Sequence, residues 1–148
     1  MKKYNSQFSN LLTSFALMIC IVESSLAAED VNTAPELEGS NWQLVHMTVL
    51  GGYEFAPEDP SKYVLNFRSD NRLTGSSDCN ELGGLWMQGG MALRFEPFNT
   101  SRKLCSPGSL HNNFSLYLRG TKSFSIESGN LVLTTTTPDV RLEFEARN

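Results

Sequence analysis

Short segments in which apolar and polar residues alternate recur along the chain, and turn-forming residues separate them. In the last of these segments, Val140, Leu142 and Phe144 alternate with charged residues. A period of two is the pattern of a strand with one buried and one solvated face. Several such segments, spaced about 8–12 residues apart, are typical of an antiparallel sandwich or barrel. No stretch resembles the β-α-β unit of a parallel sheet.

Clusters of Gly, Asn, Asp and Ser mark three predicted hairpins, with turns at 69–71, 89–90 and 128–130. The strands expected around these turns are Tyr63–Phe67 with Arg72–Gly75, Leu85–Gln88 with Met91–Phe95, and Ser123–Glu127 with Leu131–Thr137. A further strand is expected at Asn41–Leu50, where Gly51 and Gly52 end it. Proline lacks the amide hydrogen of a ladder, so Pro97 should end its strand or place it at an edge.

One segment has a helical rhythm instead. From Ser109, the residues Leu110, Phe114, Tyr117 and Leu118 follow the 3.6-residue period of an amphipathic helix, with Ser109 as N-cap and Gly120 near the end. The predicted fold is therefore mainly β (α+β): a small antiparallel barrel-like sheet of about eight strands with one helix packed at an end. The predicted core comprises Trp42, Phe67, Trp86, Phe95, Phe114, Leu118, Leu133 and Phe144.

The first 27 residues resemble a secretory signal peptide. Lys2 and Lys3 precede the apolar run Leu11–Val22, which is shorter than the roughly 20 residues of a membrane-spanning helix. Ser25 and Ala27 are small residues at the −3 and −1 positions of a cleavage site. Residues 28–36 are acidic and aperiodic, so we expect a flexible leader before a domain at 37–148. We expect a periplasmic or secreted protein without stable membrane insertion.

Cys20 does not indicate a lipoprotein, because the bulky Ile19 precedes it and the apolar run continues past it. After cleavage the chain keeps Cys79 and Cys105, which in an exported protein predict a disulfide. That bond would close a loop of 27 residues and contribute about 3.5 kcal/mol. A redox pair and a zinc site are weaker alternatives, because there is no C-x-x-C and only His46 and His111 could complete a zinc site.

The charge of the chain argues against partners that attract basic proteins. There are 12 Lys and Arg residues against 16 Asp and Glu, a formal charge of −4, and removal of residues 1–27 leaves −5. Neither nucleic acid nor an anionic lipid surface is an expected partner. No motif of a hydrolase, metalloprotease or nucleotide-binding loop occurs, so we expect no catalytic residues, no metal site and no cofactor.

Several motifs resemble those of the META domain, the module of HslJ-like heat-inducible proteins. Leu37-Glu38-Gly39 and Trp42-Gln43-Leu44 match the opening of the family pattern. The stretch with Gly75, Cys79-Asn80 and Gly84 matches its Gly-x-x-x-Cys-Asn-x-x-x-Gly part, although Ser76–Asp78 lengthens the first spacing. The threonine that precedes the second cysteine in the family pattern is replaced by Ser101, with Thr100 beside it.

The resemblance spans Leu37 to about Glu145 and implies a compact β-rich barrel with a helix and no known catalytic activity. It also implies a role in the bacterial envelope, in stress response or antibiotic tolerance. Physically, Asn80 is suited to satisfy backbone groups at a bend, and Gly75 and Gly84 offer φ freedom beside it. We therefore expect a non-enzymatic binding or chaperone-like envelope protein with another envelope protein as partner. The alternative is a lipocalin-like periplasmic carrier of a small apolar ligand, which requires a hollow barrel.

The connection Gly51–Lys62 is long for a compact domain and carries Tyr53 and Phe55. Long loops are commonly functional, and aromatic residues anchor interfaces, so this loop is a candidate docking site for a partner. The alternative is that both rings fold back and cover one end of the barrel.

Overall fold

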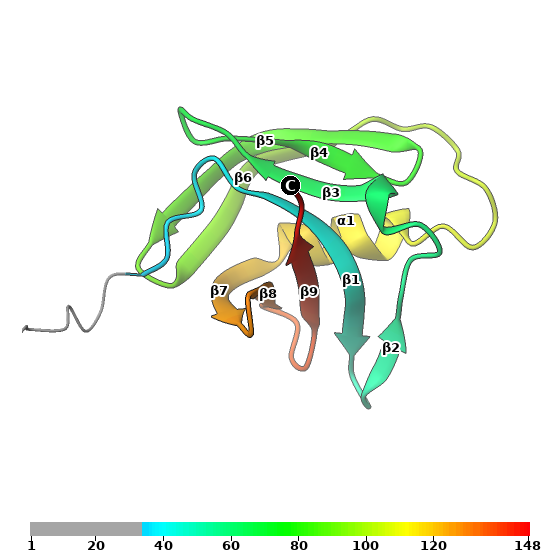
Figure 1. The fold of residues 1–148 in the computed structure, drawn as a ribbon. Helices are drawn as coiled ribbons and strands as arrows, with labels where there is room; N and C mark the ends of the chain where they lie inside the picture. The colour runs from blue at the N-terminus through cyan, green and yellow to red at the C-terminus, as the bar shows by residue number, and fades with distance from the viewer. Residues whose placement is uncertain (1–33) are drawn as a thin grey trace, which may run out of the picture. The chain divides into compact units, whose positions relative to one another are not determined.

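The computed structural model describes residues 34–148, which contain nine strands and one α-helix and fold into a closed antiparallel barrel (Figure 1). The elements are β1 (Asn41–Val49), β2 (Tyr53–Phe55), the 3₁₀ turn η1 (Pro60–Lys62), β3 (Tyr63–Phe67), β4 (Arg72–Ser77), β5 (Asn80–Gly89), β6 (Ala92–Thr100), α1 (His111–Arg119), β7 (Thr121–Glu127), β8 (Asn130–Thr135) and β9 (Arg141–Ala146).

Eight strands make the ring of the barrel. They follow the order β1-β3-β4-β5-β6-β7-β8-β9, and β9 pairs with β1 to close it. The β1–β9 ladder runs from Trp42↔Ala146 to Thr48↔Arg141 with one irregularity between Leu44 and His46. Closure leaves few strand edges open to solvent. The predicted mainly β barrel with one helix is confirmed.

The ninth strand, β2, lies outside the ring. Gly51 and Gly52, both with positive φ, form its turn with β1, where the Gly52 amide donates to the Val49 carbonyl at 2.9 Å. Strand β2 pairs with the end of β1, whereas the start of β1 pairs with β3. The segment 51–62 is thus a short strand followed by a 3₁₀ turn, not the irregular connection predicted from its turn residues.

Large apolar side chains fill the interior of the barrel. All members of the predicted core are buried, and Phe67, Phe114 and Phe144 are among the most completely enclosed. Aromatic rings meet edge to face: the centroids of Tyr63 and Phe114 are 5.4 Å apart, and those of Phe67 and Trp86 are 5.5 Å apart. The interior is therefore packed like the core of an ordinary domain.

The ring is weakest between β6 and β7. Their single pair is Ala92↔Ser123, supported by the bond from the Phe124 amide to the Met91 carbonyl at 3.0 Å. Pro97 lies inside β6, which continues to Thr100, so of the two predicted outcomes, a strand end or an edge, the structure has the edge. Around Pro97, β6 pairs with β5 alone and is an edge on its other side. Proline is tolerated at such an edge because no amide hydrogen is needed there. After the pair Ala92↔Ser123, β6 moves away from the end of α1 and the start of β7, residues Arg119–Thr121. We call this open joint the seam.

Helix α1 packs Phe114 and Leu118 into the core, as its periodicity predicts. It begins at His111 rather than at Leu110, but the hydroxyl of Ser109 still accepts from the His111 amide at 3.2 Å. Gly120 ends it, as predicted. Within residues 34–148, no helix is long and apolar enough to cross a bilayer. The predicted signal peptide 1–27 and most of the leader 28–36 lie outside the described residues.

Candidate functional site

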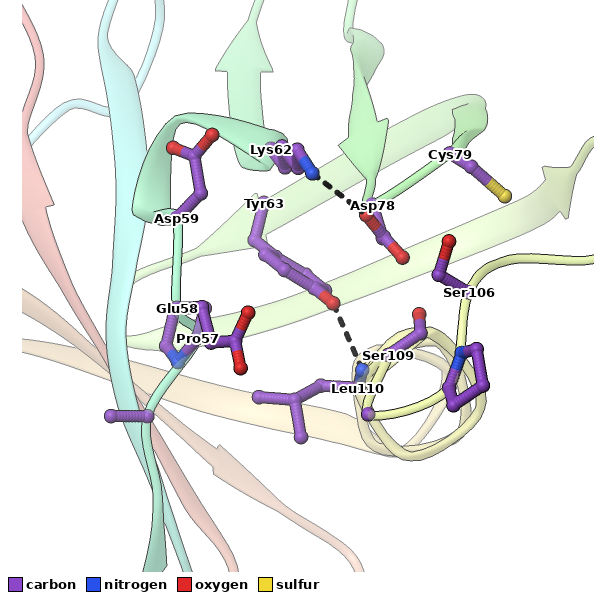
Figure 2. A pocket seen from close by; sticks show the side chains of 13 residues that line it. Pro57, Glu58, Asp59, Lys62, Tyr63, Asp78, Cys79, Ser106, Ser109 and Leu110 are labelled. Atoms are coloured by element: carbon purple, nitrogen blue, oxygen red, sulfur yellow. Dashed lines mark hydrogen bonds and ion pairs between the residues drawn. The ribbon is translucent and has the colours of Figure 1, made fainter.

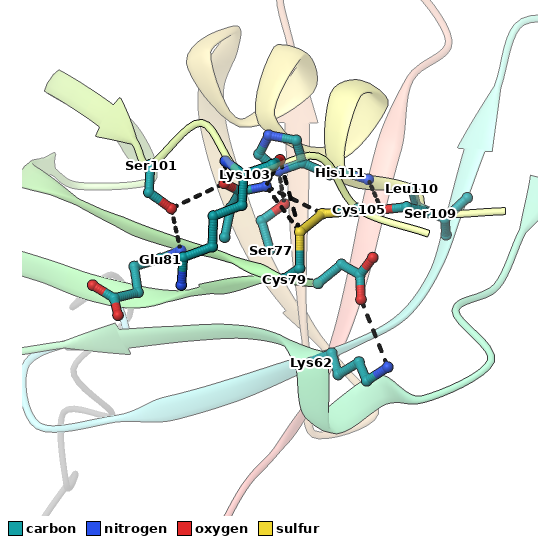
Figure 3. Close-up of a disulfide and its surroundings, with 12 residues drawn as sticks. Lys62, Ser77, Cys79, Glu81, Ser101, Lys103, Cys105, Ser109, Leu110 and His111 are labelled. Atoms are coloured by element: carbon teal, nitrogen blue, oxygen red, sulfur yellow. Dashed lines mark hydrogen bonds and ion pairs between the residues drawn. A yellow bond between two sulfur atoms is a disulfide. The ribbon is translucent and has the colours of Figure 1, made fainter. Parts of the chain in front are cut away.

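A disulfide joins Cys79, in the turn between β4 and β5, to Cys105, in the loop that follows β6 (Figure 3). This is the pair that the even cysteine count predicts. The two Cα atoms are 5.5 Å apart, within the usual range for a disulfide. The bond fastens the irregular segment 101–110 to the barrel, where no strand ladder holds it.

Asn80 completes this fastening with its side chain, which is buried to 1% exposure. Its Oδ1 accepts from the Lys103 amide at 2.7 Å, and its Nδ2 donates to the Lys103 carbonyl at 3.1 Å. Nδ2 also lies 3.2 Å from Sγ of Cys105. Asn80 thus satisfies both backbone groups of one loop residue, as its place beside a bend predicts. We call Asn80, Ser101, Lys103 and the disulfide the Asn80 clamp.

Of Thr100 and Ser101, the two hydroxyl residues named above, Ser101 is the one that contacts Asn80. The Ser101 hydroxyl donates to Asn80 Oδ1 at 2.9 Å and accepts from the Glu81 amide at 3.1 Å (Figure 3). It therefore ties the loop to the first residues of β5 and holds Asn80 in its orientation. A serine supplies the same hydrogen-bonding hydroxyl as a threonine.

Gly75 and Gly84 are required by close backbone contact. A Cβ atom on Gly75 would collide with the Val64 carbonyl in β3, and one on Gly84 would collide with the Pro97 carbonyl in β6. The expected reason, conformational freedom, is wrong for Gly75, which has no positive φ. Both glycines let a neighbouring strand approach closely, β3 at Gly75 and β6 at Gly84.

An open groove of about 440 Å³ lies next to the clamp (Figure 2). One wall is the segment 56–63, which follows β2, and the other is the segment 106–110, which leads into α1. Cys79 and Asp78 border it between these walls. We call this hollow the groove. It lies outside the filled core, at the surface of the protein.

Two interactions span the groove. The Leu110 amide donates to the hydroxyl of Tyr63 at 2.9 Å, which links β3 to the start of α1. The ammonium of Lys62 lies 3.7 Å from a carboxylate oxygen of Asp78. Figure 2 shows Lys62 pointing toward Asp78 and the Tyr63 hydroxyl pointing toward Leu110. Because Tyr63 is buried and Lys62 is exposed, the first contact contributes more to holding the walls together.

The groove is acidic. Glu58, Asp59 and Asp78 line it against one cation, Lys62. The hydroxyl of Ser61 donates to Asp59 at 2.6 Å, and this bond, with the Ser61 amide and the nearby Lys62 charge, holds the pKa of Asp59 below its usual value. Asp59 therefore stays ionised near neutral pH, and the groove favours a partner group of positive charge.

The predicted docking residues flank the groove. Tyr53 and Phe55 lie on β2, immediately before the wall at 56–63, and are 69% and 39% exposed. Leu50, in the turn before them, is 68% exposed. Neither ring enters the buried core, so the pair does not close an end of the barrel.

Other polar groupings have structural explanations. The hydroxyl of Ser77 lies 2.8 Å from Nδ1 of His111, the spacing of a nucleophile and its base, but Ser77 is fully buried and out of reach of a substrate. Asp78, Cys79 and Cys105 lie close enough to hold a metal ion, but the two sulfurs form the disulfide and are not thiolates. His46 lies elsewhere, 3.5 Å from Glu143 on the β1–β9 surface.

Sequence reasoning found the clamp and one side of the groove but missed the opposite wall. Nothing in Ser106–Leu110 resembles a motif, and its place is decided by the disulfide and by the bond to Tyr63. The pair Cys79 and Cys105, left once Cys20 is assigned to the predicted signal peptide, was the available signal that this loop returns to the turn after β4.

Known proteins resemble this chain both in sequence motifs and in fold. A profile of the META domain matches residues 35–148. An NMR structure of a protein from Burkholderia xenovorans superposes with a TM-score of 0.64 at 18% identity, covering 78% of this chain and 93% of that one.

Two further solved structures share the fold. A DUF4847 family protein from Bacteroides vulgatus ATCC 8482 gives a TM-score of 0.54 at 15% identity, over 76% of this chain and 94% of that one. Another NMR structure gives 0.55 at 20% identity, over 74% and 90%. A search among curated proteins gives no significant match. Because the profile spans the whole barrel, including the clamp, the chain belongs to the META domain family.

Proposed function

We propose that this protein is an exported, non-catalytic binding module of the cell envelope that holds a protein partner in the groove and against β2. The observation that carries the proposal is that the barrel interior is filled while the groove lies at the surface. A packed interior leaves no room for an apolar ligand, so the carrier alternative loses its main requirement.

The chemistry of the groove describes the partner. Tyr53, Phe55 and Leu50 offer exposed apolar contact, and aromatic side chains are frequent interface anchors. The three carboxylates of the groove favour a segment with Lys or Arg side chains. Within residues 34–148, β2 pairs only with β1, so its other edge offers backbone groups to an extended partner segment. A groove with both walls tied down needs little reordering on binding.

Site-specific photo-crosslinking in living cells tests this proposal. A benzophenone amino acid at Tyr53 or Pro57 should give one discrete protein adduct in the envelope fraction. The same amino acid at Met87, which is exposed near the end of β5 and does not line the groove, should give none. Equal adducts at all three positions, or none at any, would contradict the proposal.

A double substitution separates docking from structure. Tyr53→Ser with Phe55→Ser should abolish the adduct formed at Pro57 while changing the free energy of unfolding by less than about 0.5 kcal/mol, because both rings are exposed. A loss of several kcal/mol would instead mean that the rings cover the core. Intact-mass measurement of envelope material, expected to begin near Ala28, tests export. Bound lipid in native mass spectrometry would favour the carrier.

A further inference from the structure

The seam opens into a second hollow, which lies between β6 and the residues around the end of α1 and the start of β7. Beyond the single pair Ala92↔Ser123, β6 diverges from its neighbour and leaves a cleft of about 370 Å³. The cleft is lined by Arg94, Phe95, Glu96, Phe98, Arg119, Thr121 and Thr136. Arg94 and Glu96 are exposed whereas Phe95 and Phe98 belong to the core, so the cleft follows the edge of β6 rather than either face.

Arg119 is held rigidly in this cleft. Its Nη1 donates to the Phe98 carbonyl at 2.8 Å, and the carbon of its guanidinium lies 4.8 Å from the centre of the Phe98 ring. These two contacts fix the plane of the guanidinium but use only part of its donors. The remaining N–H groups stay available to an acceptor in the cleft.

Neither arginine of the cleft has a carboxylate partner in the part of the chain that the structure describes. The ion pairs there are His46–Glu143, Lys62–Asp78 and Arg141–Glu127. Arg141 therefore has a counter-ion at 2.8 Å, whereas Arg94 and Arg119 have none within 4.0 Å. Two cations and the single Glu96 give the cleft a net charge of +1.

The wall opposite β6 contains a polar atom that lacks a partner. Thr121 is 5% exposed, and its hydroxyl is the one buried side-chain oxygen within residues 34–148 without a hydrogen bond. Such groups are rare in folded proteins, and a bound water, ion or other group is one of the explanations for them. This observation is independent of the arginines and lies in the same cleft.

We propose that the seam cleft binds the carboxylate group of a small organic acid, independently of the protein partner at the groove. The planar guanidinium of Arg119 matches a carboxylate through two parallel hydrogen bonds, and Arg94 adds charge. The net charge of +1 suits a singly charged ligand better than a doubly charged one. Phe95 and Phe98 in the wall give its carbon skeleton an apolar contact.

NMR titration of the ¹⁵N-labelled protein tests the site, with sodium benzoate as the probe and sodium chloride holding the ionic strength constant. Saturable shifts should appear at the amides of Arg94, Arg119 and Thr121. Arg119→Gln should weaken binding at least tenfold, and Arg119→Lys should also weaken it because the fork is lost while the charge remains. Arg141→Gln, the matched control on β9, should change affinity less than twofold. Arg94→Gln provides the same test if Arg119→Gln does not fold.

Shifts that do not saturate, or equal affinities in Arg119→Gln and Arg141→Gln, would overturn the proposal. Inorganic phosphate is the comparison ligand. Saturation by phosphate but not by benzoate would show that the assignment to a carboxylate is wrong.

Discussion

The Asn80 clamp and the seam are two regions where the barrel does without a full ladder of backbone hydrogen bonds, and they replace it by different means. At the clamp, a covalent bond and the buried Asn80 side chain hold an irregular loop, and the backbone groups of Lys103 are both paired. At the seam, one strand pair and the Arg119 contact to Phe98 hold the strands, and the Thr121 hydroxyl stays unpaired.

The two regions differ in whether their polar groups stabilise the fold or remain free to bind a ligand. A region whose polar atoms are all paired is rigid and offers a ligand few free groups, so the clamp serves as the support of the groove beside it. A region with unpaired donors and an unpaired hydroxyl gives up stability and keeps groups free for a ligand. The disulfide and the cleft with unpaired hydrogen-bonding groups therefore lie in different regions of the same barrel.

Removing the disulfide tests the clamp most severely. The double substitution Cys79→Ala with Cys105→Ala should lower the free energy of unfolding by about 3.5 kcal/mol, because the loop of 27 residues regains its freedom in the unfolded chain. Urea denaturation measures the loss, and chemical reduction of the native protein should reproduce it. A loss below about 1 kcal/mol would mean that Asn80 alone holds the loop.

Removing the Asn80 side chain is expected to have the next largest effect. Asn80→Ala leaves the amide and carbonyl of Lys103 without partners and should cost about 2 kcal/mol. Asn112→Ala, on the exposed surface of α1, is the control and should change stability by less than about 0.5 kcal/mol. Equal effects in the two variants would remove the distinction between the clamp and an ordinary surface position.

The seam should respond in the opposite direction. Thr121→Val removes a buried hydroxyl that has no partner and should raise the free energy of unfolding by about 1 kcal/mol. Thr135→Val is the matched control on β8, because its buried hydroxyl donates to the Thr137 carbonyl at 3.0 Å, and its loss should destabilise by about 1 kcal/mol. Thermal unfolding of both variants shows whether the change in the free energy of unfolding has opposite signs in the two.

The smallest expected effect concerns the wall of the groove. Ser61→Ala removes the hydroxyl bond to Asp59 and should raise the pKa of Asp59 toward its ordinary value. Because the pKa is lowered in the folded protein, the ionised Asp59 contributes stability above its unfolded pKa, and this contribution is lost as the pH falls through the folded pKa. The window therefore lies below about pH 4. NMR titration of the Asp59 carboxyl measures the change, and Glu127 should titrate as before.

Period-two alternation predicted most strands of the barrel, because each strand has one face in the core. It failed at 53–55 and across Pro97. All three residues of β2 are exposed, so burial left no pattern there, and the Pro97 stretch lacks a second neighbour. The helical period of Leu110–Leu118 succeeded for the same reason as the strands, since Phe114 and Leu118 enter the core.

Local chemistry in the sequence determined the barrel, the helix and the cysteine pair, because apolar periodicity and the two cysteines that follow the predicted signal peptide depend only on residues and their spacing. The tertiary structure decided which distant segments face each other: Ser106–Leu110 across from the segment after β2, and Arg119 across from Phe98. It also decided that Gly75 is required by the Val64 carbonyl of another strand. A groove or cleft is formed by residues far apart in the chain, so its charge and its unpaired atoms exist only once the barrel has closed.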